Sequence, residues 1–286
     1  MRVGYPNFLE RATMIPTLND LEQLARGAGE ILRAGFPRRP GFGPAMRIDY
    51  KGEIDPVTEV DHRSDAFLLG EIERRFPGHN IASEESGMRM GDGQGTWYVD
   101  PIDGTVNFAH GLPIFTVSIA YAEEGQTQLG VVYDPLLDEC FSAGRGQGAT
   151  LNGEPIRVSQ TRELDRGLVA TGFPYDIRTH PRNNLDNYQR FSLLAQAMRH
   201  LGSAARDLSY VAAGRLDGFW ELRLKTFDIA AGALIAQEAG AIVTKVDGGA
   251  DLLAEPISIL AANPDLYPQI FGILNDSEGI SPVISE

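Results

Sequence analysis

The sequence predicts a mixed α and β fold, with an α+β first half built on an antiparallel sheet and an α/β second half. Helical spacing of apolar residues opens the chain between Leu18 and Leu32, and strand-like runs fill residues 97–151. Strands and helices then alternate through the rest of the chain. These patterns predict three parts: a tail over residues 1–16, a first lobe over residues 17–160 and a second lobe over residues 161–286.

Length and composition favour a folded protein with a large core, because 43% of the 286 residues are hydrophobic and 22% are charged. The net charge of -14 argues against nucleic acid and anionic membranes as partners. A small phosphorylated ligand stays compatible with this charge, because bound divalent cations can reverse its sign locally.

Cysteine usage and hydropathy indicate a cytoplasmic protein. Cys140 is the single cysteine, so an internal disulfide and a cysteine-based metal site are both excluded. No apolar run reaches the roughly 20 residues of a membrane helix, and the first residues lack the apolar core of a signal peptide.

The first lobe is expected to open with two helices. One covers residues 18–35, with a cap at Asn19 or Asp20. The other covers residues 61–76, and the ordinary role of Asp61 there is that of an N-cap.

Strands should follow these helices. A short strand is expected over residues 80–82, and a glycine-rich connector over residues 88–95 leads to an apolar strand. That strand should end at Asp100, because Pro101 breaks the ladder. Antiparallel hairpins then extend over residues 115–151.

The second lobe should alternate strands and helices. Its expected strands cover residues 167–172, 219–222, 241–243 and 257–262. Its expected helices cover residues 185–199, a segment after Gly202-Ser203, a segment starting at Asp228, and residues 265–274.

The end of the apolar strand carries the strongest chemical signal. Asp100 ends it, Asp103 follows, and Gly104-Thr105 could open a helical turn whose free N–H groups bind phosphate oxygens. Two carboxylates beside such a turn suggest Mg²⁺-assisted chemistry on a phosphate ester. The alternative is an ordinary Pro-Asp-Gly turn after a strand.

Three further acidic residues stand at the ends of predicted elements. Asp61 and Asp228 could cap their helices, and Glu84 could lie in a solvated turn. Their positions alone do not decide between these structural roles and a role in binding metal.

Three motifs, taken in their order along the chain, nevertheless suggest that these acidic residues belong to one site. The segments Glu84-Glu85-Ser86, Asp100-Pro101-Ile102-Asp103-Gly104-Thr105-Val106-Asn107-Phe108 and Phe227-Asp228-Ile229-Ala230-Ala231-Gly232 resemble the signatures of the inositol monophosphatase family. This family belongs to the lithium-sensitive, Mg²⁺-dependent phosphatases that also include fructose-1,6-bisphosphatases. The resemblance covers roughly residues 20–270 and implies a layered αβαβα sandwich. One departure is Phe227, where the family usually has Trp.

The resemblance also implies metal ligands. Glu84, Asp100 and the backbone carbonyl of Ile102 would bind one Mg²⁺, and Asp100, Asp103 and Asp228 would bind a second. A weaker third ion would lie near Glu84, so roughly two to three Mg²⁺ are expected per site, with Mn²⁺ as a substitute.

The expected mechanism is direct attack by a metal-activated water, with no covalent enzyme intermediate. Thr105, backed by Glu84 or Asp61, would orient that water and accept its proton. The N–H groups of Gly104 and Thr105 would hold the phosphate, and Asp228 would support the departing alkoxide through its metal.

The resemblance points to substrate contacts as well. Asp103, Asp228 and the Gly104-Thr105 pair would border the phosphate, and Glu221 would accept hydrogen bonds from hydroxyl groups. The segment with Gly202, Ser203 and Ala204 matches the one that borders the alcohol part. Lys51, Arg206, Arg223 and Lys225 keep open roles, because each could contact substrate, pack elsewhere or face water.

The leading hypothesis is a Mg²⁺-dependent phosphomonoesterase acting on inositol 1-phosphate or a related sugar or polyol phosphate. Fructose-1,6-bisphosphatase, histidinol-phosphatase and 3′-phosphoadenosine 5′-phosphate phosphatase are the enzyme alternatives. A non-catalytic, metal-binding regulatory protein is the alternative from another class. The resemblance also implies a homodimer, the commonest oligomer.

Overall fold

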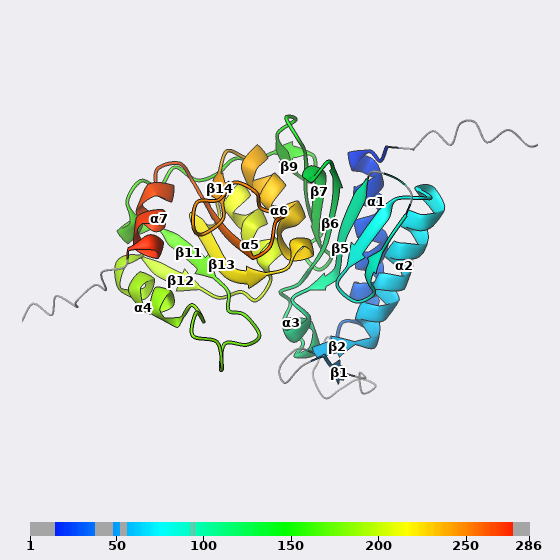
Figure 1. Cartoon of the computed structure of the whole chain (residues 1–286), viewed down its shortest axis with the longest axis horizontal. Helices are drawn as coiled ribbons and strands as arrows, with labels where there is room; N and C mark the ends of the chain where they lie inside the picture. The colour runs from blue at the N-terminus through cyan, green and yellow to red at the C-terminus, as the bar shows by residue number, and fades with distance from the viewer. Residues whose placement is uncertain (1–14, 38–47, 52–55, 92, 94, 277–286) are drawn as a thin grey trace, which may run out of the picture.

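The chain forms a sandwich of five layers that alternate helices and sheets, as Figure 1 shows. The computed structural model describes residues 15–37, 48–51, 56–91, 93 and 95–276. The predicted αβαβα architecture is therefore confirmed. Most of the predicted tail over residues 1–16 lies outside the described residues.

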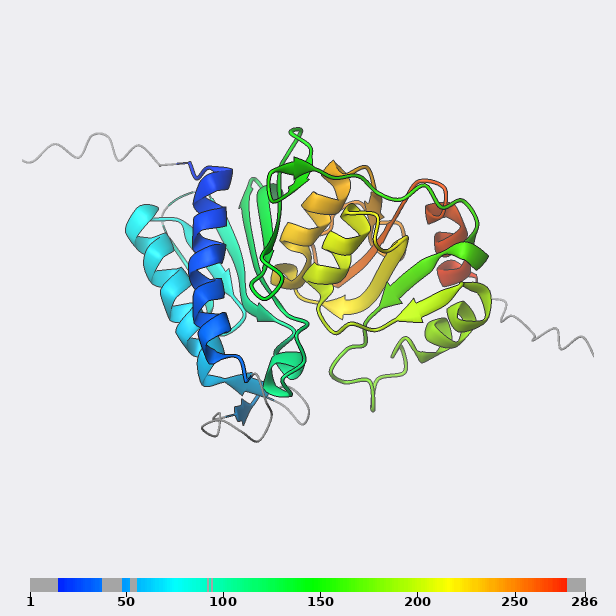
Figure 2. The ribbon, with the colours of Figure 1, turned by 180° about the vertical axis from the view of Figure 1, so that it is seen from behind.

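Two antiparallel helices, α1 (Leu18–Gly35) and α2 (Glu59–Arg75), form the first layer. Figure 2 shows them side by side on the outer face of the larger sheet. Each begins with a capping box, in which a threonine caps the helix and an aspartate three residues later binds back to it. The caps are Thr17 and Thr58, so the caps predicted at Asn19 or Asp20 and at Asp61 were wrong.

The second layer is an eight-stranded sheet with the order β10-β9-β8-β7-β6-β5-β3-β4. Its strands are β3 (Asn80–Ser83), β4 (Gly87–Arg89), β5 (Thr96–Asp103), β6 (Thr116–Glu123), β7 (Gln126–Asp134), β8 (Glu139–Gly144), β9 (Ala149–Leu151) and β10 (Glu154–Pro155). A separate two-stranded sheet joins β1 (Ile48–Tyr50) to β2 (Pro56–Thr58). The predicted connector over residues 88–95 thus begins as the edge strand β4.

Strand β5 continues past Pro101 through a β-bulge. Asp100 pairs with Ser118 and Asp103 pairs with Thr116, so β5 advances by one residue more than β6 between these pairs. In a regular strand, side chains three residues apart point to opposite faces of the sheet. The extra residue of the bulge brings Asp100 and Asp103 back to the same face. The expectation that Pro101 ends the strand was wrong, because the proline lies inside the bulge, where a ladder N–H is not needed.

The third layer consists of α5 (Ala204–Ala212) and α6 (Thr226–Glu238), which lie between the two sheets in Figure 1. Helix α6 is apolar on nearly all sides and rich in alanine. A helix of this kind suits a position that is covered by sheets on both faces.

The fourth layer is a five-stranded sheet with the order β12-β11-β13-β15-β14. Its strands are β11 (Leu168–Thr171), β12 (Ala197–Arg199), β13 (Gly218–Leu224), β14 (Ile242–Thr244) and β15 (Ile257–Ala262). The fifth layer holds α4 (Leu185–Leu194) and α7 (Tyr267–Asn275), and a short 3-10 helix covers Leu164–Arg166. The helix predicted over residues 185–199 was therefore too long, because its last part forms strand β12.

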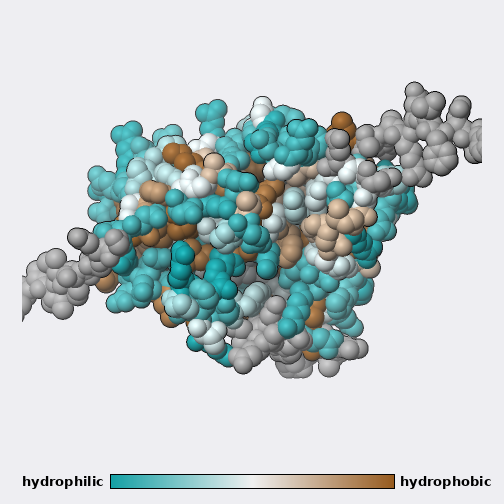
Figure 3. All heavy atoms as spheres, in the orientation of Figure 1, coloured by the Kyte–Doolittle hydropathy of each residue, from teal (hydrophilic) through white to brown (hydrophobic). Residues whose placement is uncertain are grey.

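The viewed face of the molecule is mainly hydrophilic, with hydrophobic residues scattered across it (Figure 3). Among the described helices, none is both long enough and apolar enough to cross a membrane.

Candidate active site

Acidic side chains from three separate elements gather where β3 and β5 end. The two strands are parallel and Ser83 pairs with Val99, so Glu84 emerges beside Asp100. Asp103 follows on the same strand, and Asp228 comes from the first turn of α6. Asp100 and Asp103 are both buried. The structure thus brings together four of the acids on which the sequence hypothesis depends.

The negative charges of these carboxylates raise one another's pKa values. Burial raises the pKa of Asp100 well above its usual range, and the neighbouring charges of Glu84, Asp103 and Asp228 raise it further. Burial also raises the pKa of Glu84, although the neighbouring charge of Lys51 acts in the opposite direction. Burial likewise raises the pKa of Asp103 to about 6 and that of Asp228 well above its usual value.

The donor set fits a hard divalent cation. It consists of carboxylate oxygens with the backbone carbonyl of Ile102 beside them, and such ligands suit Mg²⁺. A cation would also offset the charge repulsion that adds to the effect of burial on the four carboxylate pKa values. Across the residues that the structure describes, no three acidic, histidine or cysteine side chains already surround a single point as ligands. Binding would therefore have to draw the carboxylates together.

Asp103 is held by the start of helix α5. Its carboxylate accepts hydrogen bonds from Ser203 Oγ at 2.6 Å and from the backbone N–H groups of Ala204 at 3.2 Å and Ala205 at 2.8 Å. Thr116 Oγ1 lies 3.4 Å away from the same carboxylate. These are N-terminal helix donors, which stabilise an anion. The polar groups of Ser203 and Ala204, predicted to border the substrate, thus hold Asp103.

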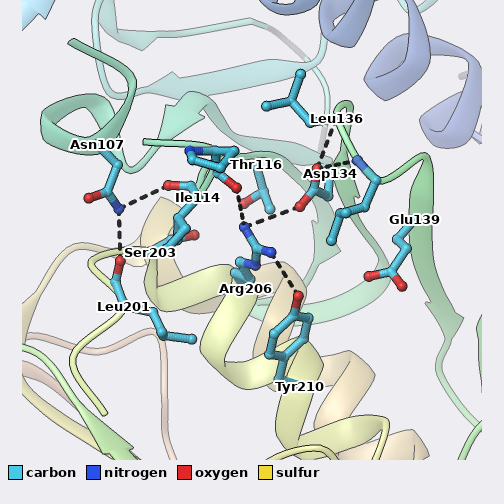
Figure 4. A network of polar contacts seen from close by, with 12 residues as sticks. Asn107, Ile114, Thr116, Asp134, Leu136, Glu139, Leu201, Ser203, Arg206 and Tyr210 are labelled. Carbon is cyan, nitrogen blue, oxygen red and sulfur yellow. Dashed lines mark hydrogen bonds and ion pairs between the residues drawn. The ribbon is translucent and has the colours of Figure 1, made fainter. Parts of the chain in front are cut away.

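The loop before α5 is fastened to the first lobe close to this contact. Asn107 Nδ2 donates to the carbonyl oxygens of Ile114 at 2.9 Å and Leu201 at 2.7 Å, as Figure 4 shows. Gly202, predicted as a substrate contact, lies against the Asn107 amide, because an added Cβ would be 3.1 Å from Asn107 Nδ2.

A buried chain of hydrogen bonds leads from α2 to Thr105. Thr105 Oγ1 lies 2.9 Å from Asp61 Oδ1 and 2.9 Å from the carbonyl oxygen of Ile102. The other oxygen of Asp61 accepts from the backbone N–H of Thr58 at 2.9 Å and from its hydroxyl group. Burial raises the pKa of Asp61. Of the two residues predicted to back Thr105, Asp61 is the one in direct contact with it.

Gly104 gives this turn its shape. It has a φ of 101° and caps the short helix α3 (Thr105–Ala109). A Cβ at this position would lie 2.9 Å from the carbonyl oxygen of Ile114, so both the conformation and the space require glycine.

A second aspartate of α2 supports the site and was not predicted from the sequence. Asp65 is buried one helical turn after Asp61 and accepts hydrogen bonds from the hydroxyl groups of Ser83 and Ser86. It therefore fixes both ends of the turn that carries Glu84. Its spacing of four residues from Asp61 was the available signal, since such residues share one helix face.

Lys51 brings a positive charge to the acidic cluster. Its Nζ lies 3.0 Å from Glu84 Oε1 and 2.6 Å from Glu85 Oε1. These carboxylates raise the pKa of Lys51, although its burial acts in the opposite direction. The option of a freely solvated lysine is wrong in this structure.

Glu221 lies on β13 at the other side of the cluster. Burial raises its pKa well above the usual value, and Asp228, Asp207 and Asp103 add to the shift. Gly172 packs against its carboxylate so closely that a Cβ there would lie 2.1 Å from Glu221 Oε2. Glu221 is therefore half-buried beside the site and does not lie on a fully solvated strand surface.

The basic residues with open roles have separate positions. Arg206 is buried and pairs with Asp134 at 3.2 Å (Figure 4), and Arg223 pairs with Asp176 at 2.6 Å. Lys225 is exposed and precedes α6, and its backbone N–H donates to Asp228 at 2.7 Å.

A family model described as "Inositol monophosphatase family" matches residues 15–278. The chain belongs to this family. It is 40% identical over 264 residues to the "Nus factor SuhB" of Escherichia coli strain K12, which covers 92% of this chain and 97% of that protein. It is also 40% identical over 247 residues to the "Inositol-1-monophosphatase" of Mesorhizobium japonicum, which covers 86% of this chain and 91% of that protein.

Solved structures of the family support the fold. The extragenic suppressor protein suhB of Bartonella henselae superposes with a TM-score of 0.83 at 37% identity, over 91% of this chain and 98% of that one. Membership in the inositol monophosphatase family supports metal-dependent phosphatase chemistry in general and a small phosphorylated substrate.

Proposed function

We propose that this protein is a Mg²⁺-dependent phosphomonoesterase that hydrolyses inositol 1-phosphate or a related polyol phosphate. One observation carries the proposal: Glu84, Asp100, Asp103 and Asp228 come from three elements and lie close enough to repel one another, with Asp100 and Asp103 buried and the other two half-buried. Buried carboxylates of this kind are costly unless a cation accompanies them. The family membership supports the same chemistry.

The bound Mg²⁺ would be held by Glu84, Asp100, Asp103, Asp228 and the Ile102 carbonyl. It would supply Lewis-acid activation of a water and neutralise phosphoryl oxygens. Roughly two to three ions per site are proposed, with Mn²⁺ as a substitute.

Residues of the chain would orient the water, accept its proton and bind the phosphate. The Thr105 hydroxyl would orient the attacking water and accept a proton from it while giving its own hydroxyl proton to Asp61, whose Oδ1 lies 2.9 Å away. The Gly104 and Thr105 N–H groups hold the phosphate, because the first N–H groups of a helical turn lack intrahelical acceptors.

The alcohol part of the substrate would lie toward the second lobe. Glu221 accepts hydrogen bonds from hydroxyl groups, and its position beside Asp228 places it next to the departing oxygen. A hydroxyl-rich alcohol suits this acidic site better than an apolar alcohol does, because carboxylates accept hydrogen bonds from hydroxyl groups. Ser203 and Ala204 support the substrate indirectly, through Asp103.

A phosphate-release screen tests this proposal. Inositol 1-phosphate, fructose 1,6-bisphosphate, histidinol phosphate and 3′-phosphoadenosine 5′-phosphate would be compared with Mg²⁺, with EDTA and with Li⁺. The expected result is release that requires Mg²⁺, with the highest kcat/KM for inositol 1-phosphate. Activity that survives EDTA without added metal would overturn the mechanism.

A regulatory role is the second candidate, because several relatives carry the name "Nus factor SuhB". Under this alternative the protein would bind divalent cations and act without turnover. A metal-induced rise in melting temperature together with no phosphate release from any of the four esters would favour it. A homodimer and a cytoplasmic location remain proposals for both candidates.

A further inference from the structure

The segment between Gly172 and Asn184 lies beside the candidate site and is fixed firmly at its two ends. Asn184 Nδ2 donates to Thr171 Oγ1 and to the Gly172 carbonyl, each at 2.8 Å, and Asn184 Oδ1 accepts from Trp220 Nε1 at 2.9 Å. The two ends of the segment are therefore drawn together by a single buried side chain. Compact loops closed in this way are often functional.

The first residue of this segment touches the site itself. Gly172 packs on the carboxylate of Glu221 with no room for a side chain. A displacement of this segment would therefore change the space beside the proposed hydroxyl acceptor.

Farther along the segment, Asp176 meets a residue with an unusual backbone. Arg223 Nη2 lies 2.6 Å from Asp176 Oδ2, and each side chain is 39% exposed. Arg223 is the extra residue of a bulge in β13, between Leu222 and Leu224, and it has a φ of 61°. A residue with a Cβ is strained in this region, where glycine is preferred.

A strained backbone conformation of this kind persists when the surrounding contacts impose it, and such residues are common at functional sites. The bulge directs Arg223, two residues after Glu221, toward the loop, and the ion pair is the contact that results. The arginine thus bridges the strand that carries the hydroxyl acceptor and the segment that covers it.

We propose that the Arg223–Asp176 ion pair is a specificity-determining clasp. It holds the middle of the Gly172–Asn184 segment, whose ends Asn184 already fixes, against the strand that carries Glu221, and thereby keeps the space for the alcohol part of the phosphate ester small. This inference rests on the proposed phosphatase function. The pair would favour compact polyol phosphates over bulky nucleotide phosphates.

Two variants break the clasp in different ways. Arg223→Gly removes the cation and places glycine where the backbone prefers it, so the folded protein should be at least as stable as the wild type. Asp176→Asn removes the anion and leaves the backbone of β13 unchanged. The matched control is Asp138→Gly, which removes another left-handed residue, with φ 54°, and its exposed ion pair with Arg26 at 3.0 Å.

Kinetics with two esters give the main measurement. In both clasp variants, KM for inositol 1-phosphate should rise about three- to fivefold, the range expected for a half-exposed ion pair, with kcat within about a factor of two. The ratio of kcat/KM for 3′-phosphoadenosine 5′-phosphate to that for inositol 1-phosphate should rise. The charge-reversed double variant Arg223→Asp/Asp176→Arg should return the ratio toward the wild-type value.

Amide hydrogen exchange gives a measurement that does not depend on turnover. Amides of residues 173–183 should exchange faster in the two clasp variants than in the wild type, and at the wild-type rate in Asp138→Gly. Unchanged exchange and an unchanged ratio in both clasp variants would overturn the proposal, as would an equal change in the control. If the wild type hydrolyses neither ester, the proposed function fails, and hydrogen exchange alone then decides whether the clasp exists.

Discussion

Replacement of Arg206 by methionine should destabilise the protein strongly, although Arg206 contacts none of the candidate ligands. Arg206 lies in the first turn of α5, and its guanidinium is enclosed between the two lobes. It pairs with Asp134 at 3.2 Å and donates to Tyr210 Oη at 2.8 Å and to the Pro113 carbonyl at 3.2 Å. The side chains of Arg206 and Asp134 are 7% and 2% exposed.

The size of the stability loss follows from the buried Asp134 carboxylate that the variant leaves without its positive partner. Asp134 would keep its hydrogen bonds from the N–H groups of Leu136 and Leu137, each at 2.9 Å, but would lose the charge opposite it. Breaking a buried pair in this way costs about 3–5 kcal/mol. Each kcal/mol lowers Tm by about 2–4 °C in a chain near this size, so Tm should fall by roughly 6–20 °C.

Arg215→Met is the matched control. Arg215 also crosses between the lobes and lies over the same Tyr210 ring, with its guanidinium carbon 4.9 Å from the ring centroid. Its partner is Glu139 at 2.6 Å, but these side chains are 37% and 18% exposed. A pair this open contributes about 1 kcal/mol or less.

The pH dependence of the Arg206→Met variant gives an independent check. Burial raises the pKa of Asp134 even though Arg206 lowers it, so removal of Arg206 should raise it further. An acid whose folded pKa exceeds its unfolded value of about 4 binds its proton more tightly when folded. The deficit in Tm should therefore shrink as pH falls from about 7 to about 5.

Differential scanning fluorimetry of the wild type, the two methionine variants and Arg206→Met/Asp134→Asn would measure these effects. The double variant should regain part of the lost Tm, because no buried charge is left unpaired. Equal losses in Arg206→Met and Arg215→Met at pH 7, or a loss that grows toward acid pH, would refute the reasoning.

Three further substitutions test the site. Asp100→Asn should reduce Mg²⁺-dependent phosphate release by about 10²-fold or more and weaken the rise in Tm that Mn²⁺ causes; near wild-type turnover would remove Asp100 from the scheme. Thr105→Val cuts the contact with Asp61, so kcat should fall by about 10²-fold while Mn²⁺ binding, followed by calorimetry, persists. Gly104→Ala introduces a Cβ at φ 101° and 2.9 Å from a backbone oxygen, so urea unfolding should show a loss of about 1–2 kcal/mol or more, and an unaltered midpoint would argue against this turn geometry.

Local sequence signals predicted most of the elements. Hydrophobic periodicity located α1 and α2, and the alternation of apolar residues located β6 to β9. Boundaries were less predictable where side chains or bulges override simple rules. Pro101 illustrates this point, because a proline that usually ends a strand is accommodated by the bulge between Asp100 and Asp103.

The sequence motifs indicated the acidic residues of the candidate site, but they did not indicate the residues that hold those acids in place. The motifs identified Asp100, Asp103 and Asp228, which the fold brings together. Sequence periodicity could not show that Ser203 would bind Asp103, or that Arg206 would pair with Asp134, because these partners lie far apart in the chain. Such contacts depend on how the two lobes meet, which no local pattern encodes.

Anomalous diffraction from crystals grown with Mn²⁺ is the most direct test of the central claim, that these buried carboxylates form one divalent-cation site. We expect anomalous peaks among the side chains of Glu84, Asp100, Asp103 and Asp228, with ordered water completing each ion's shell. Side chains that keep their present spacing, with no peak between them at saturating Mn²⁺, would contradict it.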